Sequence, residues 1–320
     1  MTYHSKFGNW DQRASVRVKP RHVLDQADLS GIYFPPELVP PAAHPLVASQ
    51  DGRTRRLLTH TLYQYLEFTA VLESIAVIPL ASRLSRRASG LDLPPAMRLD
   101  AHSIVVDEAW HARFSADLMA QVESATGVAP QLPPAPAFID RLTEITARVE
   151  PDLRSALDIL FAVVSETIIS SLLETIPKDT RLPAAVRTQV ADHAQDEGKH
   201  HAYFRALLQL FWPALSVSER RSLGALVPQL IEAFLSPDTA ALNLALFDCG
   251  LSPDEAQLVL AESYPAADIR EFAATAARST VRYFTEVGAL KDPRVHDAFT
   301  ESGLIRDKGT STQPFSSSTS

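Results

Sequence analysis

Two copies of one short motif constrain this chain more than any other feature. Asp-Glu-x-x-His occurs at residues 107–111 and again at residues 196–200. On a helix, residues three positions apart lie on the same face, so the Glu and the His of one copy can reach a single metal ion. One Glu-x-x-His arises easily by chance, whereas two copies in similar helical surroundings predict a pair of metal-binding helices.

Each motif follows a helical segment that has one acidic residue on its apolar face. In residues 53–87 the apolar residues recur at helical spacing, and Glu73 falls within their stripe. In residues 159–169 Glu166 is the only charged residue of an otherwise apolar run. A buried carboxylate is costly unless it is paired or bound to a metal, so both glutamates are predicted partners of the motifs.

Along the chain, a helix with a lone Glu precedes a helix with the motif, and this arrangement occurs twice. Ferritin-like bundles that bind two iron or manganese ions have the same set of ligands. Four glutamates carry four negative charges, which two divalent cations would balance. Oxygen and imidazole ligands without a thiolate suit iron or manganese better than copper(I) or structural zinc. A purely structural role would require these buried acids and histidines to pair among themselves. The pattern therefore predicts an all-α, ferritin-like four-helix bundle with a di-metal site.

The two motifs are not equivalent, because His193 lies one helical turn before Glu197 and Ile104 has that place in the first motif. A third imidazole would make the two metal positions unequal; the structural alternative is a core histidine bonded to a backbone carbonyl. Asp107 and Asp196 are rotated by about 100° from the adjacent glutamates. Each is expected to hydrogen-bond the outer ring nitrogen of a ligand His on a neighbouring helix, unless it is simply an exposed helix acid.

Proline-rich segments and the polar ends suggest how the chain is organised. Residues 1–52 are expected to form an extended, Pro-rich N-terminal arm over the helical body, although residues 1–20 are equally compatible with a disordered leader. Residues 53–302 are the predicted helical domain that carries the di-metal site and additional C-terminal helices, and the ligand helices lie within 53–212. The Ser/Thr-rich residues 303–320 are expected to be a disordered tail.

The helices themselves are predicted from periodicity and from proline and glycine positions. Pro79 should kink the first helix or end its first part. Gly127 should stop the second. The expected ligand-region helices span residues 53–87, 94–125, 138–149, 152–176 and 183–212.

Composition excludes several other classes of protein. The 320 residues carry a formal charge of −8, which argues against nucleic acid as a partner. The single Cys249 excludes a disulfide framework and a cysteine metal site, and it suits a reducing cytoplasm. We find neither a signal peptide nor an apolar run long enough to span a membrane. No nucleotide- or flavin-binding motif is present, so electrons would have to come from a separate reductase.

Taken together, the candidate ligands resemble those of the p-aminobenzoate N-oxygenase family of di-iron enzymes, which includes the arylamine oxygenases of aureothin and chloramphenicol biosynthesis. In that family a His one turn before the second Glu-x-x-His is a seventh ligand, and His193 occupies that place. The resemblance covers about residues 53–212. The metal-ligand set that it implies is Glu73, Glu108, His111, Glu166, His193, Glu197 and His200.

The resemblance implies O2-dependent oxidation of an amine to a hydroxylamine, and onward to a nitroso or nitro product, in natural-product biosynthesis. The catalytic group would be the di-iron centre itself, cycling between Fe2+ and Fe3+ with an external electron donor. Family members are cytoplasmic and tend to be homodimers. The amine, aryl or aminoacyl, is either free or tethered to a carrier protein.

Six residues next to the lone glutamates are candidates for a substrate pocket, and each also fits an ordinary core position. No Arg or Lys lies in these two stretches, so no side chain there would recognise a free aryl carboxylate, which favours a carrier-bound substrate. The candidates are Tyr65, Phe68, Thr69, Ile169, Ser170 and Leu173.

Other di-metal proteins share the six-ligand core and remain alternatives. They are a generic di-iron oxidase or desaturase acting on C–H bonds and a ferroxidase-type iron-binding protein. The small subunit of ribonucleotide reductase places a radical Tyr where this chain has Ser115. A non-enzymatic helical interaction module is possible only if no metal binds.

Overall fold

The computed structural model describes residues 3–25, 31–173 and 175–306, without the side chains of residues 170–172. All regular structure in these residues is helical, which confirms the predicted all-α class and is consistent with a ferritin-like bundle. The side chain of Ser170 and residues 307–320 of the expected tail lie outside the described residues.

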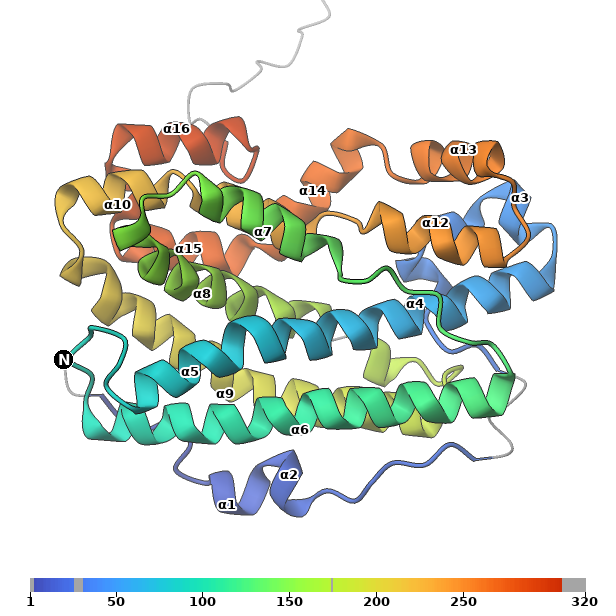
Figure 1. Ribbon diagram of the computed structural model, residues 1–320, viewed down its shortest axis with the longest axis horizontal. Helices are drawn as coiled ribbons and strands as arrows, with labels where there is room; N and C mark the ends of the chain where they lie inside the picture. The colour runs from blue at the N-terminus through green and yellow to red at the C-terminus, as the bar shows by residue number, and fades with distance from the viewer. Residues whose placement is uncertain (1–2, 26–30, 174, 307–320) are drawn as a thin grey trace, which may run out of the picture.

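Long helices form the bundle at the centre of the molecule (Figure 1). Helix α4 and its continuation α5 pack on α6, α6 packs on α9, and α9 packs on α8. Their apolar stripes meet in one continuous core. The bounds are α4 Asp51–Leu72, α5 Ile78–Ser85, α6 Pro95–Thr126, α8 Arg154–Leu172 and α9 Ala184–Ala214.

A π-helical segment, η4 (Glu73–Val77), interrupts the first long helix. We expected the irregularity at Pro79, but the α-helix already ends at Leu72 and resumes at Ile78. Proline lacks an N–H and its ring collides with the carbonyl four residues earlier, so the turn before it has to widen. Because of this widening, the irregular turn begins at Glu73, one of the candidate ligands, and π-turns are frequent at functional sites.

The ends of the other bundle helices follow from proline and glycine. Gly127, with a φ of 67°, caps α6 in the left-handed conformation that favours glycine. The loop after α6 leads to α7 (Ala137–Ala147). Helix α8 ends before the expected residue 176, where a 3-10 turn (Ile176–Lys178) containing Pro177 follows.

The N-terminal arm is not simply extended, as we had expected, because it contains a series of short helical turns. Prolines begin three of them, since a fixed φ near −65° suits the first helical position. Residues of α2 pack against both α6 and α9, whereas η3 and α3 pack on α4 at another side of the bundle (Figure 1). The turns are α1 Trp10–Arg13, α2 Ser15–Val18, η2 Pro36–Leu38, η3 Pro40–Ala43 and α3 Pro45–Ala48.

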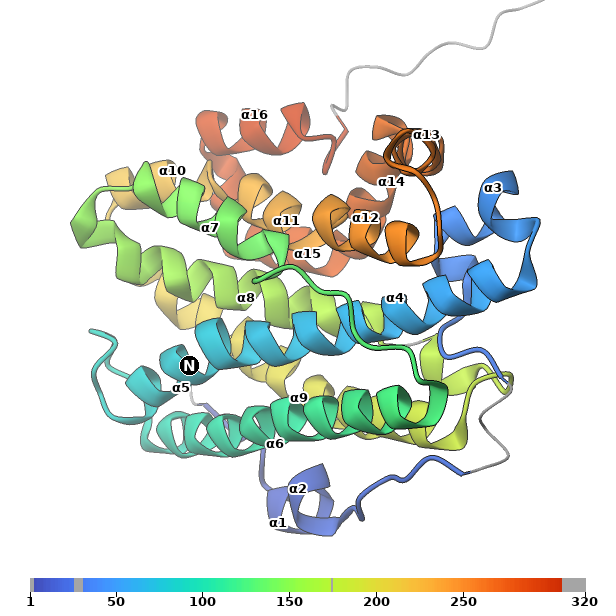
Figure 2. The same cartoon turned by 45° about the vertical axis from the view of Figure 1, so that its right-hand side comes forward.

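The C-terminal helices cover a different face of the bundle (Figure 2). Helices α11, α14 and α15 pack on α8, and α12 packs on α4. The metal-ligand helices are thus enclosed between the arm and this layer. The bounds are α10 Val217–Gly224, α11 Val227–Leu235, α12 Thr239–Asp248, α13 Pro253–Ser263, α14 Ala266–Ala276, α15 Arg278–Glu286 and α16 Pro293–Glu301.

Two helical stretches among the described residues, Asp51–Ser85 and Val217–Asp248, are long and apolar enough to cross a membrane by length and composition. The first contains the buried Glu73, and the second is divided among α10, α11 and α12. Core helices of a soluble protein pass the same test, so these stretches are weak evidence for a membrane.

Candidate metal centre

The bundle helices bring the seven candidate ligands together in its interior. Glu73 opens the π-helical segment, and α8 contributes Glu166. Helix α6 carries the Glu and His of the first motif, and α9 carries the second motif with His193. None of the seven residues is more than 2% exposed, so all are withdrawn from water.

The donor atoms fall into two groups, and within each group they lie within 4.8 Å of one another. The first group comprises Glu73, His111, His193 and Glu197. The second group comprises Glu108, Glu166, Glu197 and His200. Because Glu197 belongs to both, two cations bound here would be close neighbours.

The two motif glutamates lie between the two motif histidines. Glu108 places Oε2 3.1 Å from Nδ1 of His111 and Oε1 3.1 Å from Nδ1 of His200. Glu197 Oε1 lies 3.1 Å from the same His200 nitrogen and 3.7 Å from that of His111. Both carboxylates are therefore placed to hold metal ions at this site.

Several of these donor atoms are buried and have no hydrogen-bond partner among the described residues. They include both carboxylate oxygens of Glu73, one oxygen each of Glu108, Glu166 and Glu197, and Nε2 of His193. Leaving a buried polar atom unsatisfied costs about 1–3 kcal/mol. Metal ions would satisfy all six atoms at once, and the oxygen and imidazole donors fit iron or manganese.

Burial and charge determine how the carboxylates titrate. Burial, followed by repulsion from neighbouring glutamates, raises the pKa of Glu73 and of Glu166 well above the usual range. Burial acts the same way on Glu197, but His200 and His193 outweigh it and hold the pKa of Glu197 below its usual range. Cations at the site would remove the repulsion and favour ionisation of all four glutamates.

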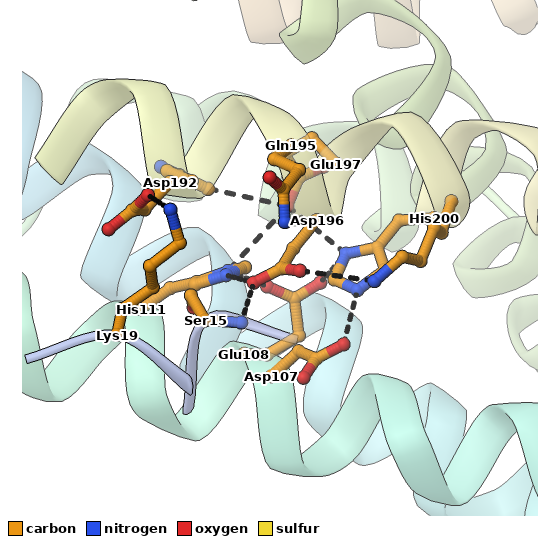
Figure 3. Close-up of polar contacts among 12 residues, drawn as sticks. Ser15, Lys19, Asp107, Glu108, His111, Asp192, Gln195, Asp196, Glu197 and His200 are labelled. Carbon is orange, nitrogen blue, oxygen red and sulfur yellow. Dashed lines mark hydrogen bonds and ion pairs between the residues drawn. The ribbon is translucent and has the colours of Figure 1, made fainter. Parts of the chain in front are cut away.

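The motif histidines are oriented by aspartates of the opposite motif (Figure 3). His111 turns Nδ1 towards the glutamates, and its Nε2 lies 3.4 Å from Asp196 Oδ2. His200 has the same arrangement, with Nε2 3.4 Å from Asp107 Oδ2. Both predicted aspartates therefore lie beside the outer ring nitrogens, where a carboxylate fixes the tautomer that leaves Nδ1 free for a metal.

The N-terminal arm holds both aspartates from outside. The indole Nε1 of Trp10 donates to Asp107 Oδ1 at 2.8 Å. The backbone N–H of Ser15 donates to Asp196 Oδ2 at 3.0 Å (Figure 3). Sequence reasoning missed these residues, and the available signal was a tryptophan close to the N-terminus.

His193 joins only the first group. Its Nε2 lies 3.3 Å from Glu73 Oε1 and 3.3 Å from Glu197 Oε1, and its ring centroid is 4.3 Å from that of His111. The nitrogen faces carboxylates, in contrast to a core histidine bonded to a backbone carbonyl. Ile104, the corresponding residue of the first motif, is fully buried and offers no ligand atom.

Part of the predicted substrate pocket lines a cavity of about 270 Å3 beside the site. Tyr65 and Phe68 belong to its wall, and the Tyr65 hydroxyl is buried without a hydrogen-bond partner among the described residues. Burial, with additional repulsion from Glu73 and Glu197, raises the pKa of Tyr65 above its usual range. The other described candidates are buried but are not part of this wall: Thr69, Ile169 and Leu173.

The sequence stretches that we expected to line the substrate pocket contain no arginine or lysine, but the cavity itself does contain an arginine. Arg141 comes from α7 and lines the wall. Its guanidinium donates to the carbonyl oxygens of Ser236 at 2.9 Å and Pro237 at 2.7 Å. The cavity therefore contains a cation, but backbone carbonyls already occupy two of its nitrogens.

The family model of p-aminobenzoate N-oxygenase AurF matches residues 9–288 of this chain. The chain belongs to this family. A relative, the 4-aminobenzoate N-oxygenase of Streptomyces thioluteus, is 25% identical over 249 residues, which are 76% of this chain and 74% of that protein. Both the family and this relative are named as N-oxygenases, so this chain is an oxygenase. The AurF family is a family of di-iron enzymes.

The matched range of the AurF family includes all seven candidate ligands, and it begins early enough to include Trp10 and Ser15 of the arm. The resemblance that we drew from the ligand spacing is thus confirmed at the level of the family.

Proposed function

We propose that this AurF-family protein uses two iron ions to oxidise an arylamine with O2, giving a hydroxylamine and then a nitroso or nitro product. One observation supports this most: seven buried oxygen and nitrogen donors form two groups that share Glu197. Several of these donor atoms make no hydrogen bond to the described residues, and two cations would satisfy them.

Each residue has a defined role in this proposal. Glu73, His111 and His193 hold one iron, and Glu166 and His200 hold the other. Glu108 and Glu197 lie between the two histidines and would hold both ions. The iron pair, when bound, supplies the chemistry of O2 activation.

The surrounding residues prepare the site. Asp107 and Asp196 keep the ring protons of the motif histidines on Nε2, so that Nδ1 is available as a ligand atom. Burial of every ligand excludes bulk water, which protects a reactive oxygen species from side reactions. The arm, residues 1–52, belongs functionally with the oxygenase domain, residues 53–302, because it holds both aspartates.

The cavity beside Tyr65 is the proposed entrance for the amine. Phe68 and Phe138 meet edge to face at 5.1 Å in its wall and would contact an aromatic ring. The Tyr65 hydroxyl makes no hydrogen bond to the described residues and would orient a polar group of the substrate. Arg141 keeps its positive charge while it donates to backbone carbonyls, so both a free arylamine carboxylate and an arylamine linked to a carrier protein are candidate substrates.

Further parts of the proposal follow from the reaction and the family. Each cycle requires electrons, and a separate reductase would supply them. We place the enzyme in the cytoplasm, as a homodimer, in a natural-product pathway.

The test combines metal analysis with product analysis. The protein is loaded with iron(II) and reduced, and free and carrier-bound arylamines are supplied with O2. We expect about two iron ions per chain and products that contain additional oxygen on nitrogen. His102→Ala is a matched control, because His102 is exposed on α6 outside both groups.

Three outcomes would contradict the proposal. Absence of bound iron would favour a helical interaction module. Oxidation of C–H bonds in place of the amine would favour a generic oxidase or desaturase. A large cage on size-exclusion chromatography, with iron oxidation and no amine product, would favour a ferroxidase.

A further inference from the structure

Part of the N-terminal arm, residues 12–24, is a basic stretch in an acidic chain. The chain has a formal charge of −8, yet this stretch contains no Asp or Glu. Within it, only the backbone N–H of Ser15 contacts an aspartate of the metal centre, so that role does not account for the basic side chains. These are Arg13, Arg17, Lys19 and Arg21.

Two of the four basic residues fasten the arm to the bundle. Lys19 lies 2.8 Å from Asp192 of α9, as Figure 3 shows. Arg21 lies 2.8 Å from Asp117 of α6, and its side chain is still 58% exposed. Ion pairing therefore holds the arm over α6 and α9 and leaves this arginine accessible.

The other two basic side chains face solvent. Arg13 is exposed. Arg17 lies 3.6 Å from Asp11, and the side chains of both residues are more than half exposed. An exposed ion pair of this kind contributes only about 0–1 kcal/mol, so a carboxylate of another molecule can replace it.

Apolar side chains lie among these charges. Val18 and Val23 are both exposed. The Trp10 side chain is half-buried, and the Arg17 guanidinium lies 5.7 Å from the centroid of its ring. Protein interfaces combine apolar and aromatic contacts with a polar rim, and arginine is enriched in them. We call this region the basic surface, which comprises Trp10, Arg13, Arg17, Val18, Arg21 and Val23.

Trp10 connects the basic surface to the metal centre. Its Nε1 donates to Asp107 Oδ1 at 2.8 Å, and Asp107 Oδ2 lies 3.4 Å from Nε2 of His200. Two polar contacts therefore join a half-buried side chain to a candidate ligand. Electrons tunnel faster through bonded and hydrogen-bonded atoms than across empty space, so this path suits the entry of electrons.

We propose that the basic surface is the docking site of a one-electron donor protein that presents an acidic surface. This inference rests on the proposed function, in which each cycle requires electrons from a separate reductase. Two reduced donor molecules each lose one electron, and a pair of ferric ions gains these two electrons and becomes ferrous. Opposite charges steer the encounter and orient the donor over Trp10.

The position of the basic surface favours an electron donor over a carrier protein that delivers the amine. A carrier has to reach the opening of the substrate cavity, whose wall includes Tyr65, Phe68 and Phe138. None of the described arm residues 3–25 belongs to that wall. A donor only has to approach a ligand closely, which the path through Trp10 allows.

The first test measures binding without iron. An acidic plant-type [2Fe–2S] ferredoxin, in its oxidised form, is titrated onto the metal-free full-length protein by calorimetry at low salt. We expect saturable binding that weakens about tenfold or more in Arg13→Glu/Arg17→Glu, with a smaller difference at high salt. Arg270→Glu/Arg278→Glu makes the same charge change at exposed arginines of α14 and α15 and should bind like wild type. A thermal melt shows that each variant is folded.

The second test measures electron transfer. Anaerobic stopped-flow absorption follows reduction of the ferric, iron-loaded protein by reduced ferredoxin and, separately, by dithionite. Arg13→Glu/Arg17→Glu should slow the reaction with ferredoxin about tenfold or more and keep that with dithionite within about twofold of wild type. Trp10→Phe should bind ferredoxin like wild type but accept electrons more slowly, per bound iron, at saturating ferredoxin.

Several results would overturn the proposal. They are the absence of saturable ferredoxin binding, equal binding in the two double variants, and an unchanged limiting rate in Trp10→Phe. A carrier protein whose binding is lost in Arg13→Glu/Arg17→Glu, while ferredoxin binding persists, would assign the surface to substrate delivery. A protein that binds no iron contradicts the proposed function, and the ferredoxin titration then still decides whether the basic surface is a docking site.

Discussion

The two Asp-Glu-x-x-His motifs occupy corresponding places in α6 and α9, and each histidine is oriented by the aspartate of the other motif. The two Nε2–Oδ2 distances are both 3.4 Å. The halves differ one turn earlier, where α9 has His193 and α6 has Ile104. Both motifs share this reciprocal contact between an aspartate of one motif and the histidine of the other. They differ in that the first donor group contains an additional imidazole, that of His193.

This difference bears on the chemistry of the two metal positions. The first group has two imidazoles, and the second group has one. Nitrogen ligands alter the affinity and electronic properties of the iron that they bind. Metal ions bound at the two positions would therefore differ in affinity and electronic properties.

The largest expected effect comes from removing the carboxylate that both groups share. Glu197→Gln should lower the iron content from about two ions per chain to nearly none. N-oxygenation would be abolished because both positions lose a charged ligand. Elemental analysis after iron loading measures this, and a variant that keeps both ions would contradict the shared role of Glu197.

His193→Ala should remove the asymmetry while leaving the six-ligand core. We expect the first position to lose most of its iron, so that about one ion per chain remains and amine oxidation falls about 100-fold. Ile104→Val is the control on α6, since it removes one methylene from the corresponding position. If iron content and oxygen transfer both survive in His193→Ala, a generic di-iron oxidase becomes the better assignment.

Asp107→Asn and Asp196→Asn test whether the two contacts between the aspartate of one motif and the histidine of the other are equivalent. Each should weaken iron(II) binding by about 10–100-fold, because the ligand histidine loses the carboxylate that orients it. Asp100→Asn is a matched control: Asp100 is buried on α6, but its hydrogen bonds go to Tyr3, Ser5 and Lys6. A strong effect in only one of the two motif variants would show that the halves differ beyond His193.

The candidate ligands could be predicted from sequence because each of them has a local signature. Glu73 and Glu166 interrupt apolar helical faces, and the motif residues have helical spacing. The contacts of Trp10 with Asp107 and of Arg141 with the substrate cavity join segments far apart in the chain. Periodicity carries no information about such contacts.

The arm and the irregular helix illustrate the same limit. Prolines in residues 36–45 indicated an irregular segment, but their effect was to begin short helical turns. Pro79 signalled a disturbance in the first helix, yet the altered turn lies before it and begins at Glu73. The altered turn precedes the proline because the proline ring collides with the carbonyl four residues earlier.

The pH dependence of the metal-free protein tests the charge balance of the site. The pKa of Glu73 is raised above its ordinary value of 4.5, and that of His111 is raised from 6.5 to about 9. The folded state therefore binds more protons than the unfolded state. His111 loses its stabilising contribution as pH rises from 6.5 to about 9, and Glu73 loses its contribution as pH rises above 4.5. Iron(II) should reverse this trend, because it binds the deprotonated ligands.

Glu73→Gln isolates one part of this effect. In the presence of a chelator, the variant should melt several degrees above wild type at pH 8 and lose most of that advantage at pH 5. With iron(II) the order should invert, since the variant lacks a ligand. A chelated wild type that becomes more stable from pH 6.5 to 9, relative to Glu73→Gln, would contradict the raised pKa.

The smallest expected effect concerns the arm, which holds one aspartate by a side chain and the other by its backbone. Trp10→Phe removes the indole N–H that donates to Asp107 and should weaken iron(II) binding about three- to tenfold. Ser15→Ala keeps the backbone N–H that donates to Asp196, and the buried Ser15 hydroxyl has no partner among the described residues. Equal losses in the two variants would mean that the arm acts by general packing and not through these hydrogen bonds.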